Sequence, residues 1–408
     1  MRKISVKHIL ILLIVVFNSR LSAQSQASLL TEASIDSISW QQYLTGDWDG
    51  LISTGKLAAE NGINFKWLQQ RLGYAHFVKG HYYKSTFHYQ KALKMDSSDE
   101  VNHLYLYYNA LNTGHFLSSR YHAGKLKPET HSELQIRSVQ PIYSIDAEYS
   151  FKRPERFYIE NEYRMDAQYR RIGLHSLLGH HLSLYQTISG FTQDFDIVNS
   201  TNQLEYLAIA SVQLSSNSTL QAGYRYVGTR SVIEPDTFYT PGHSLNGSYT
   251  QTIGRFDLTV GFNWLTNDYV TVGQWGFQLG TGFAGAIPVY LTSSIYKLNE
   301  SGINLSTFEE YNYPHYVFNQ TVGFMPFRKT WIETSLTLGD QNYFVGNNGM
   351  YLYNSQDPVQ LKTGLSLTQY FTPKLALSLH YGLEQKYNDD LDDKYFQHGL
   401  TAGIIWKL

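Results

Sequence analysis

The chain of 408 residues contains no cysteine. This absence excludes disulfides, thiolate metal sites, a cysteine nucleophile and lipidation of an N-terminal cysteine. Charged residues are also few, at 16% of the chain, whereas an ordinary soluble domain has about 25%. The formal net charge is only −2, so a general affinity for nucleic acid is not expected. We predict neither a nucleic-acid partner nor a cofactor.

Long apolar runs are missing beyond the first residues. Ile9–Phe17 is a continuous apolar stretch, but it is shorter than the roughly 18 residues that a membrane-spanning helix needs. Basic residues precede it, and Ala23 leads into Gln24, which is the layout of a secretory signal peptide. We predict a signal peptide at residues 1–23 and a short N-terminal segment at 24–35. A membrane anchor is the alternative.

Aromatic and small residues are abundant, and near the C-terminus they alternate with polar ones. The chain has 33 tyrosines, 7 tryptophans and 31 glycines, with a mean hydropathy of −0.32. Apolar side chains of the last segment fall on one side of an extended strand, at Leu400, Ala402, Ile404, Trp406 and Leu408. Such a strand would be an aggregation-prone edge in a soluble sheet, whereas a closed barrel has no edge.

The spacing of four residues in this last strand carries a resemblance. Thr401, Gly403, Trp406 and Leu408 form a pattern that resembles the C-terminal signal of bacterial outer-membrane barrels. The resemblance implies recognition by the barrel-insertion machinery, which we therefore expect as a partner.

Alternation with a period of two recurs from residue 141 onward, in segments of the length that a tilted strand needs to cross a bilayer. We predict fourteen strands near residues 142–151, 168–178, 182–194, 203–214, 218–230, 243–253, 256–267, 274–285, 288–298, 315–326, 330–340, 359–371, 375–386 and 396–408. Twelve or sixteen strands are alternatives. A soluble all-β domain is the competing fold, but its exposed face would carry many lysines and glutamates, whereas this polar face is mostly Ser, Thr, Gly, Asn and Gln.

The predicted connections alternate between short and long. Short turns interleave with longer loops at 152–167, 231–242, 299–314, 341–358 and 387–395, which is the asymmetry of outer-membrane barrels with tight periplasmic turns and longer outside loops. An even strand number puts both barrel ends on the periplasmic side. The prediction is an outer-membrane barrel over residues 141–408, in contact with outer-membrane lipid and belonging to a Gram-negative bacterium.

Residues 36–128 show a different repeat. Gly46, Gly80 and Gly114 are spaced 34 residues apart, and such a period is typical of tetratricopeptide-type helix pairs. The middle copy resembles that family through Leu72, Gly73, Gly80, Tyr82, Ser85, Tyr89 and Ala92. We predict a periplasmic helical solenoid at 36–128 and a linker at 129–140. The solenoid either binds a periplasmic protein or acts as a structural spacer.

Charged residues on the polar face of the predicted strands would line or fill the lumen. These are Asp146, Glu148, Glu205, Arg225, Asp257, Glu333, Lys362, His380, Glu384 and Lys407. Because unpaired buried charges are costly, the lumen must be wet or its charges must pair, and Glu205 and Arg225 stand on adjacent predicted strands. The two interpretations are electrostatic filling of the lumen and a permeation path that selects by charge.

Catalytic signals are few. The chain has no Gly-x-Ser-x-Gly turn, no His-Glu-x-x-His pattern and no phosphate-binding glycine loop. A Ser and His triad assembled in space stays open, because the chain has 15 histidines and many serines. The acidic segment 388–393 has the carboxylates that a divalent cation needs, but a solvated loop is the preferred interpretation. We predict no catalytic residue, no metal site and no enzyme activity.

Taken together, the fold class is α+β multidomain, with a short N-terminal tetratricopeptide-like α-solenoid followed by an antiparallel transmembrane barrel of about fourteen strands. This arrangement resembles the YaiO-type outer-membrane barrel proteins and, more distantly, the exopolysaccharide secretion porins. The resemblance implies a barrel that anchors a protein-binding solenoid and passes a small solute or a polysaccharide. The alternatives are a structural or assembly protein with a plugged lumen, and a lipid-active barrel enzyme.

Overall fold

The computed structural model describes residues 30–195, 199–233, 235–283, 285, 287–303, 309–354, 357–389 and 391–408. The predicted signal peptide lies outside these residues, as does Asp390 of the acidic segment. Two compact units divide the chain after Asn102. Each unit is described by itself below.

The described helices do not include one that is both long enough and apolar enough to cross a membrane.

The first unit is helical. Its helices are α2 (Glu32–Thr45), α3 (Trp48–Glu60), α4 (Lys66–Val78), α5 (Tyr82–Met95) and the start of α6 (Glu100–Asn112). Thr31 begins α2 with a capping box, in which its side chain accepts from the Ser34 amide. Gly46 and Gly80 follow α2 and α4 with φ of 73° and 72°, a left-handed conformation that glycine adopts without a steric penalty. The glycines of the 34-residue period therefore mark helix ends.

Helices α4 and α5 pack closely through small residues. A Cβ on Gly73 would lie 2.7 Å from ring atoms of Tyr89, so the tyrosine fits against α4 because position 73 has no side chain. Tyr89 is 1% exposed, and Leu72, Ser85 and Ala92 are buried as well. These residues belong to the predicted packing set, and so does Tyr82, whose ring lies edge-on to Phe77 at 5.7 Å. The core of the unit consists of Ile35, Leu51, Ala58, Leu68, Leu72 and Ala75.

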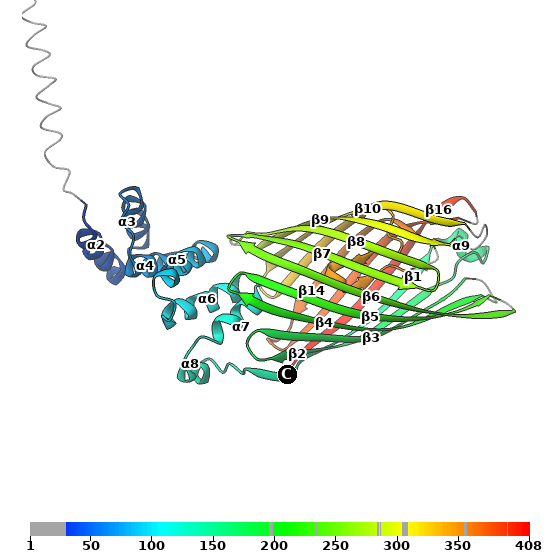
Figure 1. Cartoon of the computed structure of the whole chain (residues 1–408), viewed down its shortest axis with the longest axis horizontal. Coiled ribbons are helices and arrows are strands. Elements are labelled where there is room, and N and C mark those ends of the chain that lie inside the picture. Colours follow the sequence, from blue (N-terminus) through cyan, green and yellow to red (C-terminus); the bar gives the residue numbers. More distant parts are fainter. Residues whose placement is uncertain are drawn as a thin grey trace, which may run out of the picture. The chain divides into compact units, whose positions relative to one another are not determined.

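The second unit contains the rest of α6, α7 (Phe116–Ala123), α8 (Pro128–Glu133) and a closed antiparallel barrel of fourteen strands. The strands are β1 (Val139–Pro154), β2 (Ala167–Leu178), β3 (Leu182–Asp194), β4 (Ser200–Ser215), β5 (Ser218–Ile233), β6 (Asp236–Ile253), β7 (Phe256–Asn267), β8 (Val270–Phe283), β9 (Val289–Ile303), β10 (Glu310–Phe327), β11 (Thr330–Leu338), β14 (Val359–Tyr370), β15 (Leu375–Asn388) and β16 (Asp393–Lys407). Helix α9 (Arg156–Glu160) lies between β1 and β2 (Figure 1).

The barrel closes by pairing its first strand with its last. Tyr149 of β1 stands opposite Ala402 of β16, and the register continues along eleven residue pairs. This seam removes the edge that the apolar last strand would otherwise expose. The predicted fold class and strand number are confirmed.

The two ends of the barrel differ. We call one of them the near end. It contains the start of β1, the end of β16 and the short turns, among them 179–181, 216–217 and 254–255. At the opposite far end most strands run beyond the predicted bounds, and β5 and β6 are joined by residues 234–235 alone. The prediction of a long loop at 231–242 is wrong, because this segment extends the hairpin instead. Uninterrupted pairing from Val232 with Thr237 down to Ser218 with Gln251 holds it in the sheet.

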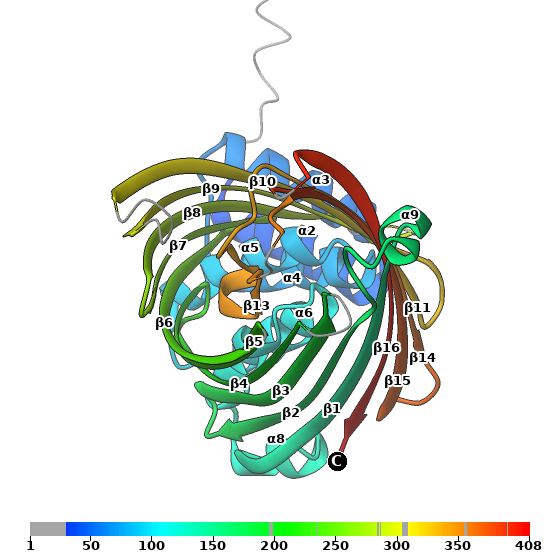
Figure 2. The same ribbon diagram turned by 90° about the vertical axis from the view of Figure 1, so that its right-hand side faces the viewer.

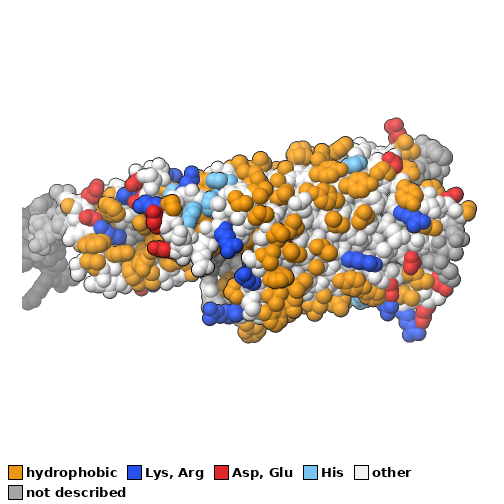
Figure 3. Space-filling view, turned by 90° about the horizontal axis from the view of Figure 1, so that it is seen from below, with side chains coloured by type: hydrophobic (Ala, Val, Ile, Leu, Met, Phe, Trp, Pro, Cys, Tyr) orange, Lys and Arg blue, Asp and Glu red, His pale blue; other side chains and the backbone are white. Residues whose placement is uncertain are grey.

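Side chains alternate between the two faces of the wall. Outward positions are apolar and exposed, as at Ile188 (62%), Leu204 (60%) and Trp275 (62%), and apolar side chains cover most of the barrel face seen in Figure 3. Inward positions carry Ser, Thr, Gln, Asn and charged groups, many of them buried. The barrel is therefore apolar outside and polar inside, the reverse of a soluble protein.

Candidate functional site

The connection from β11 to β14 folds into the barrel. We call residues 339–354 the inner loop; it contains β12 (Val345–Gly346), a 3-10 turn η1 (Asn347–Gly349) and β13 (Tyr351–Leu352), and the two short strands pair with each other. Figure 2, which looks along the barrel, shows β13 inside the ring of strands. The long connection predicted at 341–358 is present between β11 and β14, but its predicted place outside the barrel is wrong, because it contacts inward residues. The segment is a plug-like element whose partners lie on distant strands.

Hydrogen bonds fasten the inner loop to the wall. Gln274 of β8 donates to the Val345 carbonyl at 2.7 Å and accepts from the Val345 amide at 3.0 Å. Gln221 of β5 donates to the Asn348 carbonyl at 2.5 Å. A side-chain amide has both a donor and an acceptor, so it can substitute for a neighbouring strand. The loop thereby satisfies backbone groups that would otherwise be buried without partners.

The backbone conformation at the tip of the inner loop favours particular residue types. Asn347, Asn348 and Gly349 all have positive φ, at 49°, 51° and 99°, and asparagine and glycine tolerate such angles best. A Cβ on Gly349 would lie 2.6 Å from the Asn246 side-chain amide of β6. The loop backbone therefore approaches the wall at a distance that only glycine allows.

An apolar cluster holds the other side of the loop. Phe344 is 3% exposed and meets Tyr296 of β9 with ring centroids 4.9 Å apart. It also stacks on Tyr353 of the loop at 5.7 Å, and Val272 and Leu298 join the same cluster. This burial adds hydrophobic free energy to the hydrogen bonds at the tip.

Arg225 and Glu205 form a buried ion pair beside the loop tip. Both are inward residues, 3% and 5% exposed, and Arg225 donates through Nη1 to Glu205 Oε2. Arg225 Nη2 donates to the Gly349 and Met350 carbonyls at 2.9 and 2.8 Å. The arginine thus links the wall carboxylate to the loop, and Glu205 keeps it charged and oriented.

A second charged cluster joins β1, β14 and β15. Glu384 accepts from Lys152 Nζ at 2.8 Å and lies 3.0 Å from Lys362 Nζ. Lys362 donates to the Tyr353 hydroxyl at 3.3 Å and lies 4.7 Å above the same ring. This cluster is a further point of attachment between the wall and the inner loop.

A third cluster joins β1, β2 and β3. Arg171 lies 3.2 Å from Asp146 and 2.9 Å from Glu148, and the Tyr185 hydroxyl donates to Asp146 at 3.0 Å. One guanidinium between two carboxylates leaves local negative charge on this part of the lumen wall. Sequence reasoning names both carboxylates but misses Arg171, because the arginine becomes their neighbour only through strand pairing.

The remaining predicted lumen residues do not join these clusters. Asp257 lies at the near end, where it accepts from Thr252 at 2.7 Å and lies 3.1 Å from His115, the N-cap residue of α7. Lys407 stands opposite Ser144 at the same end. Glu333 faces inward between Gly323 and Ser366.

His380 and Ser366 form a pair that bears on catalysis. The Ser366 hydroxyl and His380 Nδ1 are 2.7 Å apart. Within the described part of the chain, no carboxylate lies in ion-pair distance of His380, so the third member of a Ser-His-Asp triad is missing there. Ser366 and His380 stand opposite each other in the paired strands β14 and β15.

Sequence reasoning also misses a cluster at the far end. Arg164 donates to both carboxylate oxygens of Asp357, at 2.6 and 2.7 Å, and the Tyr395 hydroxyl donates to Asp357 at 2.6 Å. Tyr158 of α9 stacks on Tyr395 at 4.1 Å. All four residues lie in or beside far-end connections, where no periodic pattern indicates which side chains meet.

Helix α7 is attached to the near end. Arg120 donates to the carbonyls of Ser138 and Gly179 at 2.7 and 2.8 Å, and Ser118 donates to the Ser216 carbonyl at 2.6 Å. Together with the contact of His115, the N-cap residue of α7, with Asp257, these bonds tie α7 to Ser138 just before β1 and to three near-end segments of the barrel wall.

Helices α6 and α7 share a pair of buried histidines, from which a pH dependence follows. His103 and His122 are 5% and 1% exposed, with their Nδ1 atoms 3.0 Å apart. Burial, with His103 beside it, lowers the pKa of His122 from 6.5 to about 3. The folded state therefore keeps His122 neutral, whereas the unfolded chain binds a proton below pH 6.5.

Acidification is consequently expected to destabilise the contact between α6 and α7. The stabilisation is complete above pH 6.5 and decreases as the pH falls toward 3, by about 2 kcal/mol at pH 5. Hydrogen exchange of the α6 and α7 amides in the full-length protein measures this loss, with amides of β4 as the internal reference. Unchanged protection of α7 between pH 7.5 and 5 would contradict it.

Comparisons with known proteins find similar solved structures at low sequence identity. No protein-family model matches the chain, and no curated protein matches it. Among solved structures, the chain is similar to CdiB from Acinetobacter baumannii, at 11% identity and a TM-score of 0.40, covering 66% of this chain and 61% of that one. It is also similar to the Ralstonia pickettii toluene transporter TbuX, at 6% identity and a TM-score of 0.44, covering 66% and 90%. A bacterial polysaccharide outer membrane secretin matches at 10% identity and a TM-score of 0.39, covering 66% and 99%.

Proposed function

We propose that the chain is an outer-membrane barrel that passes small polar solutes through a lumen narrowed by the inner loop. The observation that carries the proposal is that hydrogen bonds fasten the inner loop to the inside of a polar barrel. Eight strands suffice to fill a barrel with side chains alone, whereas sixteen or more leave an aqueous channel. Fourteen strands lie between these cases, and an inward-folded loop is what such a lumen needs to become narrow and selective.

The outward apolar face supports the membrane assignment. Exposed Ile, Leu, Phe and Trp on fourteen strands would not remain dispersed in water. In the proposed topology the near end faces the periplasm, because the short turns lie there, and the far end faces outside. The helical unit is then periplasmic, and its exposed rings Trp40, Trp67 and Phe87 support a role in binding a periplasmic protein.

The lumen chemistry indicates the class of solute. Lys152 and Lys362 share Glu384, Arg171 lies between Asp146 and Glu148, and Arg225 pairs with Glu205. The excess positive charge of the first cluster offsets the excess negative charge of the second, so the three clusters together have no net charge. Such a surface favours neutral, hydroxyl-rich solutes over strongly charged ones. We therefore propose small sugars as the solutes, and we choose them as the probes for the transport experiment.

Proteoliposome swelling tests the function. Vesicles that contain the full-length protein are placed in isotonic solutions of sugars of increasing size. We expect fast swelling with a pentose, slower swelling with a disaccharide and none with a long oligosaccharide. Equal rates for all sizes, or no swelling with the pentose, would overturn the assignment of a narrow sugar path.

A structural anchor is the second candidate function. It is favoured by the number of bonds between the inner loop and the wall, which include Arg225 to two loop carbonyls and Gln274 to both polar groups of Val345. An anchor would give no swelling with any sugar, yet it would retain a periplasmic protein that is lost when residues 36–128 are deleted.

The assignment of faces predicts unequal effects of arginine at two neighbouring positions of β15. Leu379 points outward, is 49% exposed and lies at the centre of the apolar positions 375–383. Leu379→Arg is expected to cost about 2–4 kcal/mol, because it puts a charge on the lipid face near the midplane. Ser378→Arg, on the inward face, is the matched control and should cost much less. Urea unfolding of the protein folded into lipid vesicles measures both, and similar losses would contradict the proposed faces.

A further inference from the structure

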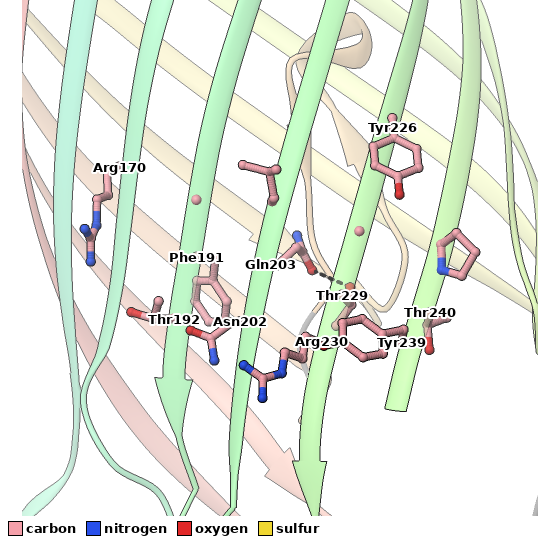
Figure 4. Close-up of a pocket in the computed structure, with 14 residues that line it drawn as sticks. Arg170, Phe191, Thr192, Asn202, Gln203, Tyr226, Thr229, Arg230, Tyr239 and Thr240 are labelled. Atoms are coloured by element: carbon pink, nitrogen blue, oxygen red, sulfur yellow. Dashed lines mark hydrogen bonds between the residues drawn. The ribbon is translucent and has the colours of Figure 1, made fainter. Parts of the chain in front are cut away.

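A groove of about 690 Å³ lies on the barrel wall across strands β2 to β6, toward the far end. Exposed side chains from outward positions line it, including Leu204 at 60% and Tyr239 at 70% exposure. Figure 4 shows Arg170, Thr192, Asn202 and Arg230 spread across four neighbouring strands. The groove opens on the outer face, and its lining also includes Phe191, Gln203, Thr229 and Thr240 from the alternate, inward positions of the same strands.

Two glycines create the hollow. Strand register places Gly190 and Gly228 on either side of Leu204 in one row across the wall. A Cβ on Gly190 would meet only a backbone oxygen, at 3.8 Å, so nothing occupies the space above that position. Over Gly228 the nearest atom to such a Cβ is the Tyr226 hydroxyl, at 3.2 Å. The floor of the groove is thus bare backbone at these two positions, on either side of the Leu204 side chain, and Tyr226 lies beside Gly228.

Arg170 and Arg230 stand at opposite sides of this hollow. Three strand spacings separate their positions, which is roughly 15 Å. Both are exposed, and neither has a hydrogen-bond or ion-pair partner within the described residues.

Other arginines near the far end are paired. Arg153 bonds Asp166, Arg156 bonds Glu160 and Arg164 bonds Asp357. The two groove arginines therefore differ from these neighbours, because neither guanidinium has an ion-pair partner among the described residues. Near the far end a long arginine side chain can reach the membrane interface, where an anionic lipid headgroup can pair with it.

We propose that this groove binds a phosphorylated, acylated glycolipid of the outer leaflet. Arg170 and Arg230 bind phosphates at the two ends of the sugar head, since guanidinium pairs with phosphate through two parallel hydrogen bonds. Thr192 and Asn202, between them, bond sugar hydroxyls. The acyl chains continue along Leu204 and Ile188 toward the near end. The inference rests on the proposed outer-membrane placement, in which the far end lies in the outer leaflet.

Binding is tested with the full-length protein, purified in mild detergent, by native mass spectrometry. The probes are lipid A, which is a bisphosphorylated acylated disaccharide, its dephosphorylated form, phosphatidylglycerol and inorganic phosphate. We expect lipid A to bind roughly tenfold more tightly than the dephosphorylated form, as one or two guanidinium-phosphate pairs predict. The double variant Arg170→Gln/Arg230→Gln should lose that preference.

Two further variants separate charge from shape. Arg255→Gln removes an exposed arginine at the near end, which lies over the rings of Phe256 and Phe283, and should bind lipid A like the parent. Gly190→Phe fills the groove without changing its charge and should weaken binding. Heat-modifiable gel mobility verifies that each variant is folded.

Equal binding of lipid A by the double variant would overturn the proposal. Equal binding of phosphatidylglycerol would show that any anionic lipid suffices, and displacement of lipid A by millimolar inorganic phosphate would show an unspecific phosphate site; both contradict a glycolipid groove. Sugar swelling is measured in parallel. Loss of lipid binding with intact swelling, or the reverse, distinguishes failure of this inference from failure of the proposed transport function.

Discussion

Replacing residues 341–356 with a short Gly-Ser linker is expected to raise the single-channel conductance in planar bilayers roughly threefold or more, because the lumen of a fourteen-strand barrel is no longer obstructed. The wall itself should stay closed. Its strand pairing, including the β1 and β16 seam, involves none of the deleted residues. The same variant should also admit the disaccharide as fast as the pentose.

A milder change tests whether the attachment of the loop, rather than its mere presence, sets the conductance. Gln274→Leu removes both bonds to Val345 and should give noisy, partly enlarged currents. Gln278→Leu is the matched control, since this residue lies on the same face of β8 and, among the described residues, its side chain hydrogen-bonds Ser294 of the wall, at 3.3 Å, and not the inner loop. Unchanged conductance in the linker variant would show that the inner loop does not limit passage.

Arg225→Met is expected to destabilise the folded barrel by about 3–5 kcal/mol, because it leaves the Glu205 carboxylate buried without its partner. The inner loop is affected as well, since the Gly349 and Met350 carbonyls lose their donor. Urea unfolding in lipid vesicles, followed by tryptophan fluorescence, measures the free energy of unfolding.

The double variant Glu205→Gln/Arg225→Met is the informative comparison. Removing the unpaired charge should restore most of the stability, since a buried ion pair can be replaced by neutral groups at little cost. Arg255→Met, at an exposed near-end turn, should change stability by only about 0.5 kcal/mol or less. A double variant as unstable as Arg225→Met would show that the loop carbonyls, rather than the carboxylate, depend on the arginine.

The sequence predicts the barrel well because strand alternation is a local signal. Leu375, Leu377 and Leu379 point to one face whatever the partners are, and a turn such as Gly254-Arg255 ends a strand through its own residues. The pairing of Glu205 with Arg225 follows from the same logic, since a tight hairpin sets their register.

The inner loop could not be predicted in this way. Its residues are polar and rich in Asn and Gly, which is the composition of an exposed loop. Its actual location depends on Gln221, Gln274 and Asn246, which lie about 70 to 130 positions away in the chain. A glutamine on the inward face looks like any lumen residue until its partner is known. The outer groove could not be predicted for the same reason. Arg170 and Arg230 lie on one surface only because β2, β3, β4 and β5 pair side by side.

The large sequence separation between the inner loop and the wall residues that it contacts predicts an order of folding. The inner loop connects strands late in the chain, and its docking surfaces on β5, β6 and β8 all precede it. Joining ends so far apart costs chain entropy that is recovered only after the intervening strands have paired. The inner loop should therefore dock last. A newly inserted barrel should have a more open and more permeable lumen until the loop has docked.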